Sequence, residues 1–474
     1  MERPVSFAYL ITLLATVLGL SACATSHVHT VETVPAAQQP AAASPMPGGY
    51  QSAEAENFIE FCLDLDSQDD HKAHPDDPRY IAHYDRNTWE PIYNSRQYVA
   101  EDLVKNYDNA ADPWYKLYHE IRVTWEHDRL HNPNPELPVP DWNAEDLKKD
   151  PRYNGFGPFQ SAWVLYRNKT IAYPPTYAIA IRGTVFSSKP SAVEDFLFHP
   201  VLAHDFLTND VSFASYNGAA VHSGFAHATF VLLLDARYGV MPVLNRYLDG
   251  ADTANLYIVG HSQGAAMATL VHAFLHYAQN AATPADDPFK LYGKHYALKS
   301  YDFAQPKPGN FYFAADFARY TQAADSAIVV NNAIDVVPQV PLTLQDLGDI
   351  EGYVSHMPFW SNALRYVAGI GSGFRGTVGR VAEPFVKRAD SGYGNFYGYP
   401  PGTACDTDKT GKSWNFVPAG HLILVFGQPP APTSPDASDT FVQHHAWTYR
   451  NLIHEQLEQG GAGQVPGSGT VQSP

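Results

Sequence analysis

The stretch Leu256-Tyr-Ile-Val-Gly-His-Ser-Gln-Gly264 decides the fold of this chain. An apolar, β-prone run ends at Gly260, and an alanine-rich segment with a helical stripe of apolar residues follows Gly264. Glycines on both sides of Ser262 allow a sharp bend, because neither adds a Cβ to it. A G-x-S-x-G pattern between a strand and a helix is typical of a nucleophile elbow, which presents a serine at the edge of a sheet. The alternative interpretation is an ordinary turn between a strand and a helix.

The surrounding sequence alternates between strand-like and helix-like segments. This order predicts an α/β fold with a mostly parallel sheet flanked by helices. We find no internal linker, so residues 51–459 are predicted as one domain, with an N-terminal extension (51–155) and a long insertion (342–413) before the last strand. Strands are expected at 162–166, 177–181, 256–260, 298–303, 327–331 and 422–426, and helices at 98–118, 226–248, after the elbow and at 444–457.

Composition restricts the class of protein. With 45% hydrophobic and 17% charged residues, the 474-residue chain is typical of a folded globular protein. Its 31 basic and 49 acidic residues give a net charge of −18, which argues against nucleic acid as a partner. The three cysteines form no Cys-x-x-Cys pair, which argues against a zinc or redox cysteine motif.

The N-terminus is predicted to be an export signal. The apolar run 7–20 has the length of a signal-peptide core and is short for a transmembrane helix. It ends in Leu20-Ser-Ala-Cys23, which resembles a bacterial lipoprotein signal. That resemblance implies removal of residues 1–22, lipidation of Cys23 and, with Ala24 next, anchoring in the outer membrane. A plain secretory signal with a coincidental cysteine is the alternative.

Both ends of the mature chain are expected to be flexible. Residues 23–50 are rich in Ala, Pro, Gln and Ser and are predicted to be a tether, whereas 460–474 are rich in Gly, Ser and Pro and are predicted to be a disordered tail. In an exported protein, Cys62 and Cys405 face an oxidising compartment. They either form a disulfide or remain buried thiols.

Five ordered blocks resemble the class 3 (fungal-type) lipases. One block is the elbow, and Ala304 stands where the fourth has glycine in the family. The blocks are Ala180-Ile-Arg-Gly-Thr184, Val221-His-Ser-Gly-Phe225, Gly260-His-Ser-Gln-Gly264, Phe303-Ala-Gln-Pro-Lys-Pro-Gly-Asn310 and Val329-Val-Asn-Asn-Ala-Ile-Asp-Val-Val-Pro338. The resemblance covers about residues 160–340 and implies an α/β-hydrolase fold with a Ser-Asp-His triad.

The triad needs a carboxylate that orients the histidine. Asp335 matches the family's aspartate and follows a predicted strand, whereas Asp302 is a rival carboxylate that no family motif supports. The family's histidine lies near the C-terminus of the domain, which here indicates His444, with His445 as the alternative. Tyr449 lies five residues after His444, a spacing found in many bacterial relatives.

Two other histidines are predicted to have no catalytic role. His421 aligns with the final strand and is expected to be structural. His261 lies within the elbow, where we expect it to pack or to form local hydrogen bonds.

The resemblance also implies an oxyanion hole and a lid. The backbone N–H groups of Thr184 and Gln263 are the expected oxyanion donors, with the Thr184 hydroxyl as a third. Within 186–220, the apolar residues Phe196-Leu-Phe198 and Phe206-Leu207 either form a lid or pack in the core.

We expect no cofactor and no metal. The one candidate for calcium is Asp406-Thr-Asp-Lys-Thr-Gly411, which resembles the start of an EF-hand loop but has Val417 where that loop requires glutamate. The acidic run Asp64, Asp66, Asp69 and Asp70 is interpreted as a solvated loop.

Together these features predict an exported, lipid-anchored serine ester hydrolase of lipase or esterase type. It would act on a lipid or other ester through an acyl-enzyme. The alternative is a non-catalytic, lipid-binding envelope lipoprotein that keeps the hydrolase fold.

Overall fold

A computed structural model describes residues 46–66, 74–95, 161–184, 200–204, 211–234, 239–280, 289, 291–341, 343 and 413–458. Several predictions lie outside these residues. They concern the signal and Cys23, nearly all of the tether, the helix at 98–118, Cys405, the EF-hand-like run and the tail 460–474, together with almost the whole insertion 342–413.

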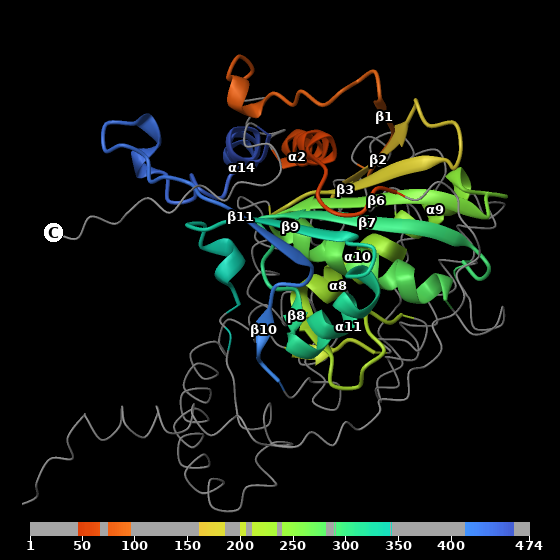
Figure 1. Cartoon of the computed structure of the whole chain (residues 1–474). Helices are drawn as coiled ribbons and strands as arrows, with labels where there is room; N and C mark the ends of the chain where they lie inside the picture. The colour runs from red at the N-terminus through yellow and green to blue at the C-terminus, as the bar shows by residue number, and fades with distance from the viewer. Residues whose placement is uncertain are drawn as a thin grey trace, which may run out of the picture. The chain divides into compact units, whose positions relative to one another are not determined.

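A seven-stranded sheet forms the centre of the described chain, in the order β1-β2-β3-β6-β7-β9-β11 (Figure 1). β1 and β2 pair antiparallel, as do β2 and β3, and every later pair is parallel. The predicted α/β-hydrolase architecture with a mostly parallel sheet is therefore confirmed. The strands are β1 (Trp89–Asn94), β2 (Trp163–Asn168), β3 (Thr176–Ile181), β6 (Thr253–His261), β7 (His295–Phe303), β9 (Ala327–Asn332) and β11 (His421–Val425).

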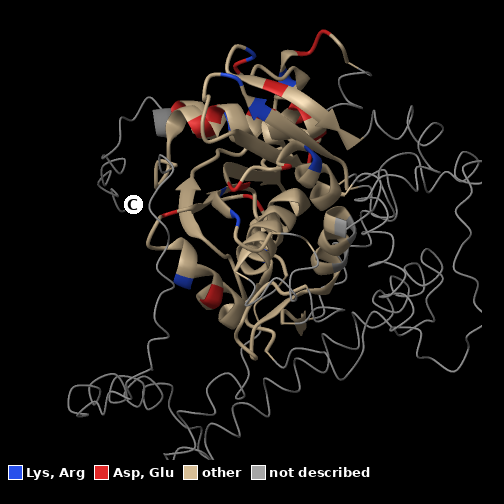
Figure 2. Ribbon diagram, turned by 90° about the vertical axis from the view of Figure 1, so that its right-hand side faces the viewer, with Lys and Arg blue, Asp and Glu red and all other residues tan. Residues whose placement is uncertain are grey.

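Helices cover both faces of this sheet (Figure 1). α8 (Ser223–Leu234), α9 (Val240–Tyr247), α10 (Gln263–Gln279) and α11 (Phe311–Thr321) enclose one apolar core. α2 (Ser52–Asp66) and α14 (Ala446–Ile453) enclose a second core on the opposite face. Charged residues are sparse along the described ribbon, as burial on both faces of the sheet requires (Figure 2).

A smaller antiparallel sheet joins four short strands in the order β10-β8-β5-β4. They are β4 (Pro200–Leu202), β5 (Ala220–His222), β8 (Gly309–Asn310) and β10 (Phe416–Val417). Within the segment 186–220, residues 200–202 and 220 belong to this sheet, and Val201, Val211 and Phe213 are buried. The apolar residues of the expected lid, 196–198 and 206–207, lie outside the described residues, so the choice between lid and core stays a prediction.

The structure places the boundaries of two helices differently from the prediction. The segment 226–248 contains two helices instead of one, since Gly239 has an extended backbone and precedes the start of α9. The last helix begins at Ala446 because His445 is extended (φ −61°, ψ 142°), and it continues past Ile453 as a π-helical turn, His454–Glu458.

The interpretation of the acidic run as a solvated loop is wrong for its first half. Asp64 and Asp66 lie in α2, which packs its apolar face on the sheet, whereas Asp69 and Asp70 are not described. Phe61 stacks on Tyr166 of β2 with 3.8 Å between ring centroids, so part of the extension belongs to the core. Cys62 of the same helix is a free, fully buried thiol.

In the described part of the chain, the helices are all too short or too polar to cross a bilayer.

Candidate active site

Ser262 occupies a strained turn between β6 and α10. Its φ is +58°, a conformation that few non-glycine residues adopt, and its N–H donates to the Phe303 carbonyl at 2.9 Å. A Cβ on Gly260 would lie 2.1 Å from the Gly264 carbonyl oxygen, and one on Gly264 would lie 2.4 Å from the Ile181 oxygen. Both flanking glycines are therefore required for the approach of the bend to its neighbours, as the sequence predicts.

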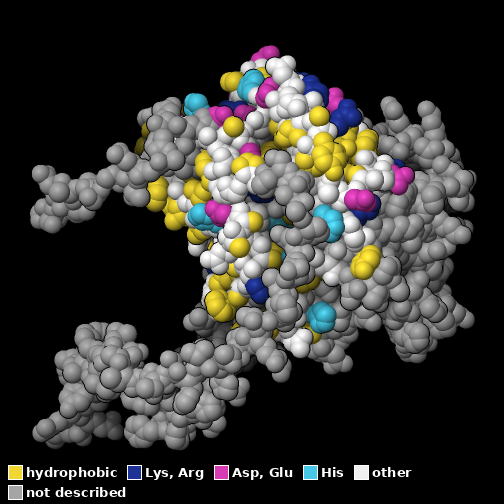
Figure 3. All heavy atoms as spheres, turned by 45° about the vertical axis from the view of Figure 1, so that its right-hand side comes forward, with side chains coloured by type: hydrophobic (Ala, Val, Ile, Leu, Met, Phe, Trp, Pro, Cys, Tyr) yellow, Lys and Arg dark blue, Asp and Glu magenta, His cyan; other side chains and the backbone are white. Residues whose placement is uncertain are grey.

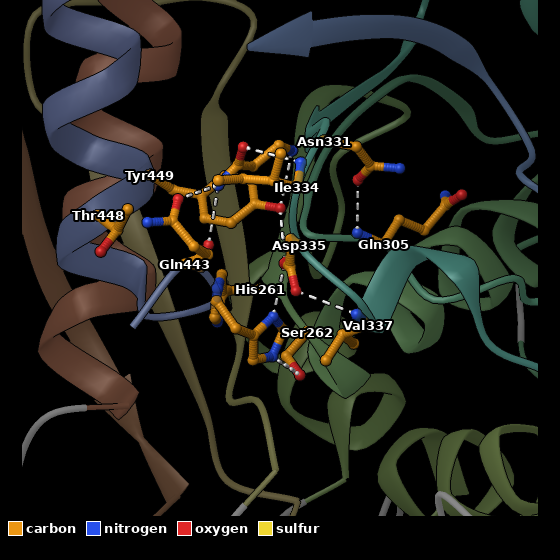
Figure 4. Close-up of polar contacts among 12 residues, drawn as sticks. His261, Ser262, Gln305, Asn331, Ile334, Asp335, Val337, Gln443, Thr448 and Tyr449 are labelled. Carbon is orange, nitrogen blue, oxygen red and sulfur yellow. Dashed lines mark hydrogen bonds and ion pairs between the residues drawn. The ribbon is translucent and has the colours of Figure 1, made fainter. Parts of the chain in front are cut away.

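His444 lies beside the serine, although the two are 182 residues apart in sequence. Its Nε2 is 2.7 Å from the Ser262 Oγ, and its Nδ1 is 2.8 Å from the Asp335 Oδ2. All three residues are nearly inaccessible to solvent. The structure thus brings together the serine, histidine and aspartate that the sequence singles out. Figure 4 labels Ser262 and Asp335 of this group.

Asp335 follows β9 and is held by further donors. The Val337 N–H donates to its Oδ1 at 3.0 Å, and the buried Tyr449 hydroxyl donates to its Oδ2 at 2.8 Å. These bonds to the charged form fix the rotamer of the carboxylate and compensate for its burial. Figure 4 shows Tyr449 and Val337 beside the Asp335 carboxylate.

Asn332 joins the loop of the aspartate to that of the histidine, a role that its sequence context does not reveal. Its backbone N–H donates to the Tyr449 hydroxyl at 2.9 Å, and its side-chain amide donates to the Gln443 carbonyl and to the Gln443 Oε1. Its Oδ1 accepts the Gly427 N–H at 2.9 Å. Because Gln443 directly precedes His444, this network holds the imidazole near Asp335.

Burial lowers the pKa of His444 below its usual range, and nearby His261 and His445 act in the same direction. The hydrogen bond and the negative charge of Asp335 oppose this effect. The imidazole is therefore neutral near pH 7, which is the form that accepts a proton from serine.

His445, the alternative base, points elsewhere. Its Nε2 lies 2.7 Å from the Asp439 carboxylate, its side chain is about one-third exposed, and its backbone forms the N-cap of α14. His421 opens β11 and pairs with Asp325 on the surface, which agrees with a structural role.

Asp302, the rival carboxylate, is fully buried away from the histidine. It accepts hydrogen bonds from Thr269 and Ser300, and desolvation raises its pKa well above the usual value. It therefore belongs to a polar cluster beneath α10.

Thr184 and Gln263 flank the serine from two sides. Gln263 opens α10, whose N-terminal N–H groups and dipole favour negative charge. Thr184 follows Gly183 at the end of β3, and a Cβ on Gly183 would lie 3.2 Å from the Ser262 Cβ. This close approach results from the parallel register of β3 and β6, in which Ile181 pairs with Gly260.

The family's glycine position in the fourth block is occupied by Ala304, which has a φ of +52°. Glycine adopts this region without strain, whereas alanine does so at a cost of about 1–2 kcal/mol. Ala304 thus holds a backbone conformation that glycine would adopt more readily.

Exposed apolar side chains surround the loop of Asp335. Ile334, Val336 and Val340 are between 42% and 59% exposed, so they give this loop an apolar outer surface. Figure 3 shows that apolar side chains also gather elsewhere on the described surface, among charged and histidine side chains. Within the described ranges, no cluster of three or more His, Cys, Asp or Glu side chains is arranged to hold a metal ion.

A parallel sheet whose elbow serine is linked through a histidine to a buried aspartate defines the α/β-hydrolase class. Residues 178–345 match the family model described as lipase (class 3). This part of the chain therefore resembles the class 3 lipases.

Individual proteins are similar to part of this chain. A secreted mono- and diacylglycerol lipase of Malassezia globosa, MDL4, is 28% identical over 179 residues, which are 37% of this chain and 50% of that protein. The chain thus spans about half the length of this curated relative. Among solved structures, M37 lipase has 20% identity and a TM-score of 0.29 over 40% of this chain and 52% of its own. A lipase from Rhizopus microsporus var. chinensis has 20% identity and a TM-score of 0.26, with coverage of 49% and 70%.

Proposed function

We propose that this protein is a serine hydrolase that cleaves carboxylic esters of lipids through an acyl-enzyme. The observation that carries the proposal is the continuous hydrogen-bonded path from the Ser262 Oγ through His444 to Asp335. A binding module has no need of a neutral histidine between a strained serine and a buried carboxylate.

In the acylation step, the Ser262 Oγ attacks the ester carbonyl carbon while the His444 Nε2 takes the hydroxyl proton. Asp335 stabilises the imidazolium, with Tyr449 and the Val337 N–H stabilising the carboxylate. The tetrahedral intermediate then breaks its bond to the alcohol, which leaves with the proton from His444. Water attacks the acyl-enzyme in the same way, with His444 again taking and returning the proton.

The oxyanion of each intermediate would be held by the backbone N–H groups of Thr184 and Gln263, with the Thr184 hydroxyl as a third donor. One such donor typically contributes about 10²–10³-fold in turnover. The proposed reaction uses only side chains, backbone groups and water, so it requires no cofactor.

A lipid ester is the proposed substrate class. The apolar rim of Ile334, Val336 and Val340 beside the aspartate supports this choice, because acyl chains favour contact with apolar surfaces. The match of residues 178–345 to the class 3 lipase model and the similarity to a mono- and diacylglycerol lipase support the same substrate class.

We also propose that the protein is exported and held at the outer membrane by a lipid on Cys23. The sequence Leu20-Ser-Ala-Cys23 supports this, and the similar Malassezia protein is described as secreted. Incorporation of radioactive palmitate into the wild type, but not into Cys23→Ala, is the expected result. Equal labelling of both would contradict the anchor.

The enzymatic proposal is tested with the detergent-solubilised full chain and p-nitrophenyl esters of four, eight and sixteen carbons. The wild type is expected to hydrolyse them and to react with a fluorophosphonate at Ser262, whereas Ser262→Ala does neither. Absence of both reactions in the folded wild type would favour the non-catalytic lipid-binding alternative. The dependence on chain length identifies the preferred acyl group.

A further inference from the structure

Asp66, the last residue of α2, reaches two segments of the candidate active site. Its Oδ1 accepts the backbone N–H of Gly183 at 2.8 Å, and its Oδ2 lies 2.8 Å from the Nδ1 of His261. Gly183 and His261 belong to different strand ends, so one carboxylate connects three separate parts of the chain. Asp66 also lies outside the family region 178–345.

Each contact is one residue away from a group with a proposed catalytic role. Gly183 directly precedes Thr184, whose N–H is a proposed oxyanion donor, and His261 directly precedes Ser262. A Cβ on Gly183 would be 2.8 Å from the His261 carbonyl oxygen, so the two backbones are in close contact here. Asp66 therefore fixes the separation between the oxyanion donor and the nucleophile from outside both loops.

The hydrogen-bond partners of His261 indicate which ring nitrogen carries its proton. Its Nε2 is buried and has no hydrogen-bond partner among the described residues. A proton on Nε2 would thus be an unsatisfied buried donor, whereas a proton on Nδ1 is directed at a carboxylate. A proton on Nδ1 is therefore favoured over one on Nε2, and with it Asp66 accepts a hydrogen bond from each of its two neighbours.

Local structure does not explain the presence of this aspartate. A carboxylate at the C-terminal end of a helix faces the negative end of the helix dipole, which is unfavourable. The side chain is about 20% exposed, so it is also partly removed from water. The two donors from β3 and the elbow compensate for this placement.

We infer that Asp66 is a positioning residue for the proposed hydrolase, holding the Thr184 oxyanion donor and the Ser262 nucleophile at their working separation. The inference rests on the proposed ester hydrolysis. It couples the N-terminal extension to the chemistry, because the carboxylate belongs to α2. Displacement of a reacting group by about 1 Å can lower turnover by about 10²-fold.

The central variant is Asp66→Asn, which keeps the size of the side chain. One carboxylate oxygen becomes an NH₂ group, which cannot accept a hydrogen bond. It would face either the Gly183 N–H or the protonated His261 Nδ1, so one of the two contacts is lost. With a water-soluble p-nitrophenyl ester we expect kcat to fall about 10- to 100-fold with KM changed less than about two-fold, and fluorophosphonate labelling to slow in parallel. Unchanged kcat in the folded variant, or a loss confined to KM, would overturn the inference.

The matched control is Asp252→Asn, since Asp252 forms an exposed ion pair with Lys294 and its side chain is 81% exposed. Its kcat is expected to stay within about two-fold of the wild type. If wild-type chain neither hydrolyses the ester nor labels, the proposed function fails and the inference falls with it. An active wild type with an unaffected Asp66→Asn refutes the inference alone.

A second pair of variants keeps the test decisive if Asp66→Asn does not fold. His261→Asn keeps an N–H donor at the δ position, whereas His261→Leu removes it. We expect His261→Asn to retain at least about ten times more kcat than His261→Leu. Equal kcat in the two folded variants would show that the contact with Asp66 does not position the nucleophile.

Discussion

Replacing Tyr449 by phenylalanine tests the network behind the proposed triad. The hydroxyl is fully buried, donates to the Asp335 Oδ2 at 2.8 Å and accepts the Asn332 N–H at 2.9 Å. Phenylalanine keeps the ring in place, so the change removes one oxygen and two hydrogen bonds.

The magnitude follows from these two bonds. Loss of a hydrogen bond to a charged group costs about 1.5–3 kcal/mol, and leaving the Asn332 N–H buried and unsatisfied costs about 1–3 kcal/mol. Because one oxygen serves both, we expect a loss of about 3 kcal/mol in the free energy of unfolding. Asp335 keeps the Val337 N–H and His444, so kcat is expected to fall only about ten-fold, which corresponds to about 1.4 kcal/mol.

The pH profile should move as well. Without the tyrosine hydroxyl, the negative charge of Asp335 is less compensated and stabilises protonated His444 more strongly, which raises the pKa of the histidine. The acid limb of kcat/KM should therefore shift to higher pH, because the neutral form is needed as the base.

Urea unfolding and ester hydrolysis measure these effects, with Tyr173→Phe as the control. The Tyr173 hydroxyl contacts Thr253, and its side chain is exposed. With an m-value of about 3 kcal/mol/M, the urea midpoint of Tyr449→Phe should fall by about 1 M. If the two variants agree in midpoint, kcat and pH profile, the reasoning about this network is refuted.

Two further predictions concern histidines. His445→Ala should change kcat less than about three-fold because the side chain pairs with Asp439, whereas His444→Ala should lower it at least about 10³-fold; the reverse order would exchange their roles. Burial in α10 lowers the pKa of His272 to about 3, below its usual value near 6.5 in the unfolded chain. As the pH falls below 6.5, the unfolded state binds a proton that the folded state does not, so His272 contributes a loss of about 1.4 kcal/mol of stability per pH unit toward pH 3. Urea unfolding of the wild type and His272→Gln at pH 6, 5 and 4 should show a shallower pH dependence in the variant, and equal slopes would contradict this.

The sequence predicts the centre of the fold because its signals there are local. The strand, glycine and serine pattern around Ser262 indicates the elbow, and the pattern of alternation predicts a mostly parallel sheet. The amino-acid sequence predicts helix boundaries less well. The segment 226–248 is divided before Gly239, and the last helix begins after His445, whose neighbour His444 remains in the preceding turn.

Sequence by itself determined which residue types are available: a serine in an elbow, an aspartate after β9 and two adjacent histidines. Only the tertiary structure separated the histidines, because adjacent residues of a turn point in different directions, toward Ser262 and toward Asp439. It also assigned Asn332 to the triad network and moved Asp66 from an assumed loop to the site. The contacts of Asp66, of Asn332 with Tyr449 and of His444 with Asp335 join residues 109 or more positions apart. Such contacts are set by the packing of α2 and α14 on the sheet, which no local sequence pattern encodes.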